Sequence, residues 1–489
     1  MTSRFSSSVA LKVASATLVL LLSAGGVGRG QAAALAGEMT AAPAAALSTE
    51  TTIDAYGPQK PSANRALRDA LSRSGALPLT SSQRAILRAV DAFYAERGDA
   101  PLFFDKGQWT AQARGAFERL QKAPDDGLDL RGWRVYSLDP APEASLALGD
   151  IALSEAVAAY AFQASGGRID PARISRLIAP RAGVASPAQV LDEISKAADA
   201  GAALQNYNPR QPGYMALREK LAQTRAEPVS GPVARLAARD SSKRASDAVG
   251  SIGRRSAALE SEILVNMEFW RWLPRDLGRD RIMVNVPEFM ARLYRDDSLE
   301  LSTRVIVGKP DKTTPLFSDQ MEYLIVNPSW NVPQSIIKNE MMNKLDSLRR
   351  QGYDVEWVNG KLRVRQPPGE RNALGQIKFI FPNDYAVYMH DTPTRNLFQA
   401  SVRAFSHGCV RVDQPFKFAE TLLRPERGWT EARLRKMVGK NERRVALPTP
   451  VPVHIVYFTM AEDESGQWRR FDDIYGYSAK ARELLGVKP

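Results

Sequence analysis

A single cysteine, Cys409, limits how this chain of 489 residues can be stabilised. One cysteine cannot form a disulfide within the chain, so stability has to come from buried apolar surface. Cys409 directly follows Ser406, His407 and Gly408, and His390 lies nineteen positions upstream of it. A thiol close in sequence to two candidate bases is the pattern of an acyl-transfer enzyme.

The first 36 residues predict export. Arg4 and Lys12 precede an apolar run over residues 13–22, and an Ala-Leu-Ala sequence ends at Ala36. This is the pattern of a signal peptide (1–36) with an A-x-A cleavage site. An uncleaved membrane anchor is the alternative, but the run is short and interrupted for a bilayer span. We therefore expect no transmembrane segment after cleavage.

The composition excludes several classes of protein. Because the leader carries three basic residues and no acidic one, cleavage lowers the net charge from +12 to +9, and a basic chain suits an anionic envelope. The sequence contains no C-x-x-C zinc pair, no P-loop and no G-x-G-x-x-G turn. We therefore expect no metal, no other cofactor and no nucleic-acid partner.

The pattern changes several times before the cysteine. Residues 37–65 are rich in Ala, Ser, Thr and Pro without an apolar period, which predicts a flexible tether. Residues 66–225 have a helical period, and the apolar stretch at 151–162 suits a buried central helix. We expect an all-α domain with a scaffold or docking role there. The Pro, Gly, Arg and Ser content of 226–258 predicts a linker.

Residues 259–489 are predicted to form a mostly β catalytic domain, so the chain is expected to be a multidomain α+β protein. Turn residues separate short β-rich runs at 281–286, 303–307, 322–327, 377–381, 385–390 and 453–459. Residues 334–376 interrupt this pattern with a helical stretch and a Pro-Pro-Gly loop. We interpret them as a helical insertion that can lie over a cleft.

The residues around the thiol suggest distinct roles. A free thiol titrates near pH 8.5 and needs a neighbour that stabilises its thiolate. His390 ends a β-rich run and can reach Cys409 if its strand lies beside the thiol loop, so we predict that it is the base. His407 lies two residues from the thiol and is predicted to have a structural or substrate-ordering role. The N–H groups of Gly408 and Cys409 are a predicted oxyanion hole, and Asp413 a predicted helix N-cap.

Two structural alternatives stay open from these residues alone. A lone cysteine is often a small buried apolar residue, and a nearby histidine is often a hydrogen-bonded core residue. A metal site built from His390, His407 and Cys409 is the second alternative.

These residues resemble the L,D-transpeptidase family with the YkuD-type catalytic domain. Its signature is a histidine, a spacer of about fifteen residues and Ser/Thr-His-Gly-Cys, which His390, residues 391–405 and residues 406–409 match. Arg411 stands where many members have Asn, as in the large periplasmic subgroup with an N-terminal scaffold domain. Segments such as Asn327–Pro333 also resemble that subgroup. The peptidoglycan-binding module that large members often carry is not evident, since only 226–258 occupies its place.

The resemblance implies an activity and a location. Cys409 would attack the L,D-bond of a peptidoglycan tetrapeptide stem, D-Ala would leave, and a neighbouring stem's amine would capture the thioester to give a 3→3 cross-link in the periplasm. His390 would take and return the proton, without a cofactor. The residues implied to bind substrate are Ser406, His407, Arg403, Arg411, Tyr388 and Trp330.

Three alternatives to cross-linking remain. Water could resolve the same thioester, which is L,D-carboxypeptidase activity, or an outer-membrane protein could supply the acceptor amine. The alternative from another class is a non-catalytic wall-binding protein whose thiol is only buried.

Overall fold

The computed structural model describes residues 81–133, 138, 143–179, 183–226 and 243–487, which all belong to one compact unit. The predicted signal peptide and tether lie outside these residues. Within the described ranges, no helix is both long and apolar enough to cross a membrane.

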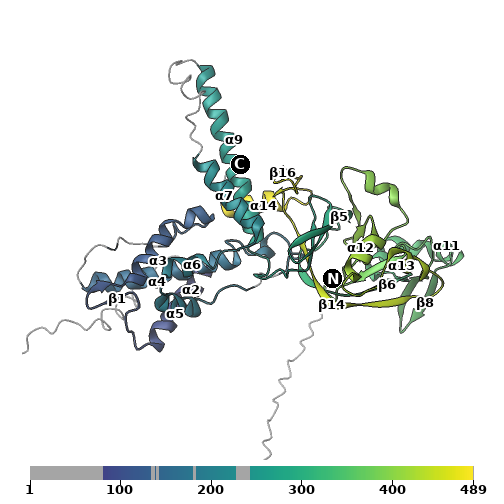
Figure 1. Ribbon diagram of the computed structural model, residues 1–489, viewed down its shortest axis with the longest axis horizontal. Helices are drawn as coiled ribbons and strands as arrows, with labels where there is room; N and C mark the ends of the chain where they lie inside the picture. The colour runs from purple at the N-terminus through teal and green to yellow at the C-terminus, as the bar shows by residue number, and fades with distance from the viewer. Residues whose placement is uncertain (1–80, 134–137, 139–142, 180–182, 227–242, 488–489) are drawn as a thin grey trace, which may run out of the picture. The chain divides into compact units, whose positions relative to one another are not determined.

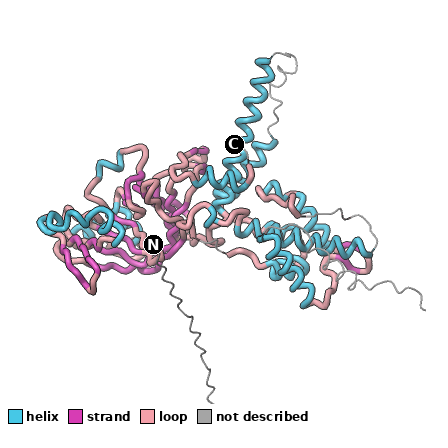
Figure 2. The backbone as a smooth tube through the Cα atoms, turned by 180° about the vertical axis from the view of Figure 1, so that it is seen from behind, coloured by secondary structure: helices cyan, strands magenta, loops and turns pink. Residues whose placement is uncertain are grey.

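The regular structure described between Ser81 and Ala226 is mainly helical, and Figure 2 shows these helices in cyan. Its helices are α2 Ser81–Glu96, α3 Ala111–Gln121, α4 Glu143–Gly166, α5 Pro187–Lys196, α6 Ala200–Gln205 and α7 Pro212–Ala226, with the 3-10 turns η1 Ala123–Asp126 and η2 Pro171–Arg173 and the hairpin β1 Phe104–Asp105 and β2 Gln108–Trp109. The expected central helix is confirmed, because α4 is buried along most of residues 151–162.

A buried carboxylate ties several of these helices together. Asp126 is fully buried and accepts from Arg119 Nη2 at 2.6 Å, the Tyr160 hydroxyl at 2.6 Å and Arg218 Nε at 2.7 Å. These donors come from α3, α4 and α7. Two guanidinium groups and a hydroxyl therefore compensate a charge that would be costly to bury alone.

The predicted linker at 226–258 is partly wrong. Helix α9, Lys243–Trp270, begins inside it, so only residues 227–242 lie outside the described chain. Gly250 and Gly253 suggested a linker, yet a glycine costs a helix only about 1 kcal/mol. The second half of α9 packs beside α7 through a shared core (Figure 1), and that burial outweighs the local propensity.

Nine of the later strands form a sheet that closes on itself. They are β3 Arg281–Asn285, β4 Met290–Arg295, β5 Ser298–Gly308, β6 Ser318–Val326, β10 Ile377–Ile380, β11 Met389–His390, β12 Ala404–Ser406, β13 Val410–Val412 and β14 Arg443–Val456. Their order is β12-β5-β13-β11-β10-β6-β14-β3-β4, and β4 also pairs with β5. The six expected β-rich runs all contribute residues to these strands.

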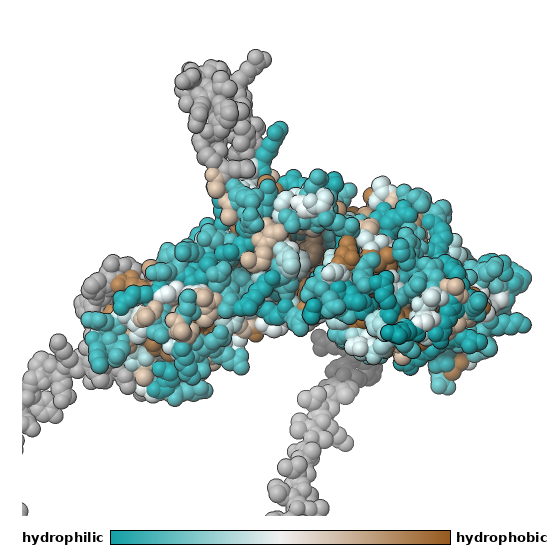
Figure 3. Space-filling model, viewed as in Figure 1, coloured by the Kyte–Doolittle hydropathy of each residue, from teal (hydrophilic) through white to brown (hydrophobic). Residues whose placement is uncertain are grey.

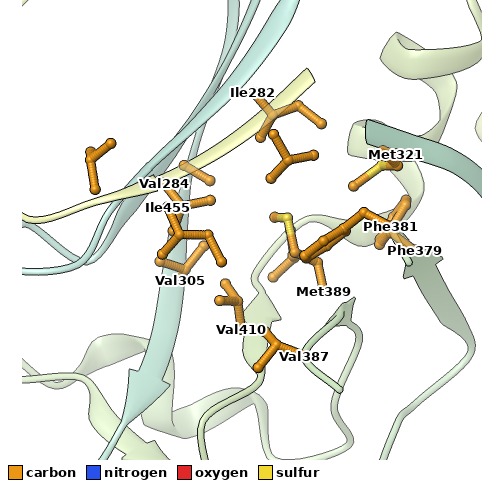
Figure 4. Packing of buried hydrophobic residues seen from close by; sticks show 14 of the residues in the cluster. Ile282, Val284, Val305, Met321, Phe379, Phe381, Val387, Met389, Val410 and Ile455 are labelled. Carbon is orange, nitrogen blue, oxygen red and sulfur yellow. The ribbon is translucent and has the colours of Figure 1, made fainter. Parts of the chain in front are cut away.

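Apolar side chains at alternate strand positions fill the interior of this closed sheet. Val284, Val305, Met389, Val410 and Ile455 point toward one another in Figure 4 and are at most 1% exposed. The helices α12 Pro415–Leu423, α13 Glu431–Lys436 and α14 Tyr477–Leu485 add apolar side chains to the same core, and β15 Met460–Glu462 pairs with β16 Trp468–Arg470 outside it.

The insertion at 334–376 is only partly helical. Its helical segments are α10 Gln334–Ile336, the π-helix η3 Ile337–Met341, the 3-10 turn η4 Met342–Lys344 and α11 Leu345–Arg350. The hairpin of β8 Asp354–Val358 and β9 Lys361–Gln366, which the sequence did not suggest, joins β7 Trp330–Asn331 in a separate sheet. A small core that includes Ile337, Leu348 and Leu362 makes the insertion a packed subdomain.

We expect Asp126→Ala to lower the stability by about 3–5 kcal/mol, because it leaves buried Arg119 without its counter-charge. Urea denaturation measures the loss. The exposed neighbour variant Asp125→Ala is the control and should stay within about 0.5 kcal/mol of the wild type. Equal stability of the two variants would contradict the role of Asp126.

Candidate active site

The parallel pairing of β11 with β13 brings the two halves of the sequence signature together. Met389 is the partner of Val410, and His390 is the partner of Arg411. The Val410 N–H donates to the Tyr388 carbonyl at 3.1 Å, which extends the alignment back toward Cys409. The condition on which His390 was predicted to be the base, a strand beside the thiol loop, is therefore met.

One face of this sheet carries the polar groups. Met389 and Val410 point into the core, so the alternating positions Tyr388, His390 and Arg411 face the other way. Cys409 precedes Val410 and lies on the same side. On the neighbouring strand β10, Lys378 is the register partner of His390 and joins this face.

The thiol loop is held by the Ser406 hydroxyl. Ser406 Oγ donates to the Cys409 carbonyl at 2.6 Å and accepts from the Gly408 N–H at 3.1 Å. Ser406 is 2% exposed and its hydroxyl shapes the loop, while it also lines the cavity, so its contact with substrate stays a prediction.

Gly408 has a conformational role in this loop. Its φ of +115° is a conformation that side chains disfavour, so glycine is required. The Gly408 N–H donates to Ser406 Oγ, so it is not free to bind an oxyanion. The prediction that this N–H contributes to an oxyanion hole is therefore wrong.

The thiol opens onto a cavity of about 640 Å³ with four walls. The thiol loop (406–409) and the polar sheet face form two walls. The insertion forms the third with Ser335, Ile336, Asn339, Glu340 and Met341, and the loop from Pro310 to Pro315 forms the fourth together with Leu177. The insertion thus lies over the cleft, where the sequence suggested it.

Burial and nearby cations act in opposite directions on the thiol. Burial raises the pKa of Cys409, while a hydrogen bond from the Tyr388 backbone, the charge of Lys378, the Tyr388 side chain and the charge of Arg411 lower it. The thiol is therefore not a preformed thiolate in this environment. The same cations disfavour a proton on a neighbouring base.

His390 is held as a neutral imidazole. Burial, with the charges of Arg411 and Lys378, lowers its pKa to about 3, against the hydrogen bonds of the Asp391 and Leu374 backbone. Nδ1 lies at 2.5 Å from the Asp391 carbonyl oxygen. Since a carbonyl only accepts, Nδ1 carries the proton, and the lone pair is on Nε2.

Tyr388 links the thiol to its surroundings. Its side chain hydrogen-bonds with Cys409 and with Trp330, and burial is the main reason why its pKa is raised above 10. The Tyr388 ring packs edge-on against His390 at 5.6 Å, and Lys378 Nζ lies 3.8 Å from the centre of the same ring. Trp330 and Tyr388 both line the cavity, as expected.

His407 points toward the insertion. Its Nε2 lies 2.8 Å from Glu340 Oε1, which also accepts from Lys312 Nζ at 2.6 Å. These two partners lower the pKa of Glu340, the Lys312 hydrogen bond contributing most. The contacts of Glu340 with His407 and Lys312 therefore join the thiol loop, the insertion and the 310–315 loop at the cavity.

The two predicted carboxylate-binding arginines differ. Arg411 lines the cavity, and its buried Nε has no hydrogen-bond partner among the described residues. Arg403 lies outside the cavity lining and donates to the carbonyls of Val305, Ala400 and Phe289 at 3.0 to 3.2 Å. All three of these hydrogen bonds hold the Arg403 guanidinium against the backbone. Arg403 therefore anchors the loop, and the prediction that it binds substrate is corrected.

Two family models match the chain. Residues 279–453 match the L,D-transpeptidase catalytic domain YkuD, and residues 88–221 match the Scaffold domain. The chain therefore contains a YkuD-type L,D-transpeptidase catalytic domain and a Scaffold domain. A curated relative from Haemophilus influenzae, named "Putative L,D-transpeptidase", is 37% identical over 218 residues, which are 40% of this chain and 44% of the relative. The match thus spans less than half of that relative.

Solved L,D-transpeptidases are also similar to the chain in part. One from Mycobacterium smegmatis is 12% identical with a TM-score of 0.22, covering 36% of this chain and 58% of that chain. One from Enterococcus faecium is 15% identical with a TM-score of 0.18, covering 42% and 64%. Scores this low carry no argument, so the description of the fold rests on the strand pairing of this chain itself.

The metal alternative has no support from the geometry. The rings of His390 and His407 are directed to Asp391 and Glu340, respectively. In the part of the chain that the structure describes, no three His, Cys, Asp or Glu side chains gather as metal ligands.

The predicted cap of the next helix is wrong. The N-cap of α12 is Gln414, and no side chain caps it. The Asp413 carboxylate instead accepts from Arg304 Nε at 2.9 Å. Strand β13 separates Cys409 from α12, so the N-terminus of this helix is not adjacent to the thiol in sequence.

Sequence reasoning missed Lys378 and Glu340. Lys378 is the single charged residue of the run 377–381. A charged residue within an otherwise apolar strand could have indicated from sequence that Lys378 belongs to the site. Glu340 gave no such signal, because its importance comes from contacts with His407 and Lys312 that are distant in sequence.

We expect Lys378→Met to raise the pKa of the Cys409 thiol, because the variant removes a cation that stabilises the thiolate. The rate of alkylation by iodoacetamide as a function of pH measures this. The inflection should move to higher pH, and alkylation at neutral pH should slow severalfold. Lys378→Arg should retain the wild-type profile, and so should the exposed control Lys361→Met. An unchanged profile in Lys378→Met would contradict the role of Lys378.

A second prediction concerns the neutral His390. Its folded-state pKa of about 3 lies below the unfolded value near 6.5, so the unfolded chain takes up the proton first as the pH falls. His390 therefore lowers the free energy of unfolding as the pH falls from about 6.5 toward 3. The variant His390→Asn has no titrating imidazole at this position and should not show this decrease. The stability difference between wild type and variant should change in the variant's favour by about 3 kcal/mol between pH 7.5 and pH 4.5 in urea denaturation. A difference that is constant with pH would contradict the burial of a neutral imidazole.

Proposed function

We propose that this protein is a peptidoglycan L,D-transpeptidase that uses Cys409 as nucleophile and His390 as base. The observation that carries the proposal is the placement of the thiol, the imidazole and Arg411 on one sheet face at the wall of a single cavity. The match of residues 279–453 to the catalytic domain supports the reaction class.

In the first step, the Cys409 sulfur attacks the carbonyl carbon of the L,D-bond before the terminal D-Ala of a tetrapeptide stem. His390 Nε2 takes the thiol proton as the sulfur–carbon bond forms. The tetrahedral intermediate collapses, the proton passes to the leaving amine, and D-Ala departs. A neutral imidazole beside a neutral thiol suits this sequence, because the proton moves only when the substrate is present.

The developing oxyanion needs donors. We propose that the Cys409 N–H and the Tyr388 hydroxyl donate to it, because the Gly408 N–H already donates to Ser406 Oγ. Arg411 offers a guanidinium with an unpartnered Nε and is proposed to bind a stem carboxylate.

In the second step, the amine of a neighbouring stem attacks the thioester carbonyl. Its proton goes to His390, the sulfur–carbon bond breaks, and the thiol is regenerated with a new 3→3 amide cross-link. Water as acceptor would release a tripeptide stem, and a protein amine would attach an outer-membrane protein instead. The stem amine is the acceptor that we favour, and the experiment below separates the three.

The proposed setting is the periplasm, reached through the signal peptide at 1–36. Residues 66–225 would form the scaffold domain and residues 259–489 the catalytic domain. The scaffold-domain match at 88–221 and the cell-wall chemistry of the family support this arrangement.

The test is a product analysis with purified residues 37–489 and a disaccharide-tetrapeptide. The wild type should give a dimer that lacks one D-Ala, detected by mass spectrometry. Cys409→Ala should abolish both the dimer and the thioester adduct, a loss of at least about 1000-fold, because the nucleophile is removed. Cys409→Ser, which keeps the size of the side chain, is the matched control for folding.

Other outcomes would identify another acceptor. Loss of D-Ala without a dimer would indicate hydrolysis. If a lysine-bearing acceptor peptide is then added and becomes joined to the stem, the acceptor is a protein amine. Retained activity in Cys409→Ala would overturn the proposal. No reaction of the wild type, with intact binding to sacculi, would favour a wall-binding protein.

A further inference from the structure

A segment of the helical part crosses onto the catalytic sheet. We call residues 167–179 the strap. At its start, the Ile169 N–H donates to Glu268 Oε1 at 2.7 Å, and Glu268 on α9 is fully buried. The Ile169 side chain is 2% exposed and belongs to the core that fills the closed sheet. The strap is therefore anchored in the interior of the catalytic part.

The far end of the strap pairs with the catalytic part like a short strand. The Leu316 N–H donates to the Leu177 carbonyl at 2.8 Å, and the Ala179 N–H donates to the Leu316 carbonyl at 2.9 Å. This makes Ile178 and Leu316 partners in a parallel bridge. Ile178 is 6% exposed and packs into the same core as Ile169.

Alternation at this bridge directs Leu177 away from that core. Adjacent residues of an extended segment point to opposite sides, so the burial of Ile178 turns Leu177 outward. The Leu177 side chain is 38% exposed and lines the cavity that holds Cys409. Among the described residues, exposed large apolar side chains are few, and the face in Figure 3 is mainly hydrophilic. An exposed leucine that lines a cavity therefore points to a contact with a ligand.

The position of Leu177 is fixed by the local backbone. Its N–H donates to Ser175 Oγ at 3.1 Å, and the Ile178 N–H donates to the Ser175 carbonyl at 3.2 Å. The bridge partner Leu316 continues from the 310–315 loop, which hydrogen bonds to Tyr475 and Tyr477 secure. Leu177 is thus held before any ligand binds.

The cavity lining combines charged and apolar groups. Arg411 contributes a cation with an unpartnered Nε, whereas Lys312 is paired with Glu340. Pro310, Pro315 and Leu177 contribute apolar surface. A stem peptide has the matching composition, because it combines carboxylates with the methyl groups of alanine residues.

We propose that Leu177 is a substrate-contacting residue that packs against the apolar part of the stem peptide. The helical part thereby contributes a specificity-determining side chain to the catalytic cavity, in addition to any scaffold role. This inference rests on the proposed function, since it names the substrate that the cavity binds.

The test compares three variants of purified residues 37–489. Leu177→Ser should raise KM for the disaccharide-tetrapeptide about tenfold with kcat within twofold, because loss of apolar contact weakens binding without touching the reacting atoms. Leu177→Met should restore KM to near the wild-type value. Leu148→Ser is the matched control, since Leu148 is 44% exposed on α4 and does not line the cavity, and it should leave KM unchanged.

Two further measurements make the result decisive. Alkylation of Cys409 by iodoacetamide should proceed at the wild-type rate in Leu177→Ser, and Tm should match that of Leu148→Ser. If Leu177→Ser lowers Tm further, Leu177→Ala is judged by the same KM criterion. An unchanged KM in an active, folded Leu177 variant would overturn the inference. Inactivity of the wild type itself would instead overturn the proposed function, so the two failures are distinguishable.

Discussion

The parallel pairing of β11 with β13 is the constraint on which the site depends. Parallel neighbours need a crossover connection, and here residues 391–409 supply it. Asp391, only 3% exposed, fixes the start of that crossover by accepting from the N–H groups of Gln376 at 2.8 Å and Thr392 at 2.6 Å. Because this register also turns Met389 and Val410 into the core, a slip by one residue would bury the polar face and expose the apolar one.

Burial and charge together set the protonation of the site. The low-polarity surroundings favour a neutral thiol and a neutral imidazole, while Lys378 and Arg411 favour the thiolate and oppose an imidazolium. The His390 imidazole is thus kept free of a proton, and a Cys409 thiolate is stabilised once the thiol proton leaves. Such an arrangement suits a nucleophile that should react with a bound substrate and stay unreactive otherwise.

Three parts of the chain build one cavity. The closed sheet supplies Cys409 and His390, the insertion supplies Glu340, and the strap supplies Leu177. The contacts of Glu340 with His407 and Lys312 tie the insertion to the thiol loop, and those of Ile178 with Leu316 tie the helical part to the sheet. The helical part and the catalytic part therefore meet at the same cavity, which is a reason for them to be carried on one chain.

The sequence alone determined the signature at His390 and residues 406–409, the β-rich runs and the buried helix α4, because these depend on local spacing and on period. Tertiary structure alone decided the register that sets His390 beside Arg411, and the places of Lys378, Glu340 and Leu177 in the site. It also reassigned the N–H of Gly408 and the guanidinium of Arg403, and it made residues 243–258 helical. These outcomes rest on hydrogen bonds and packing between segments far apart in the chain, and no local pattern encodes which distant partner a polar group will find.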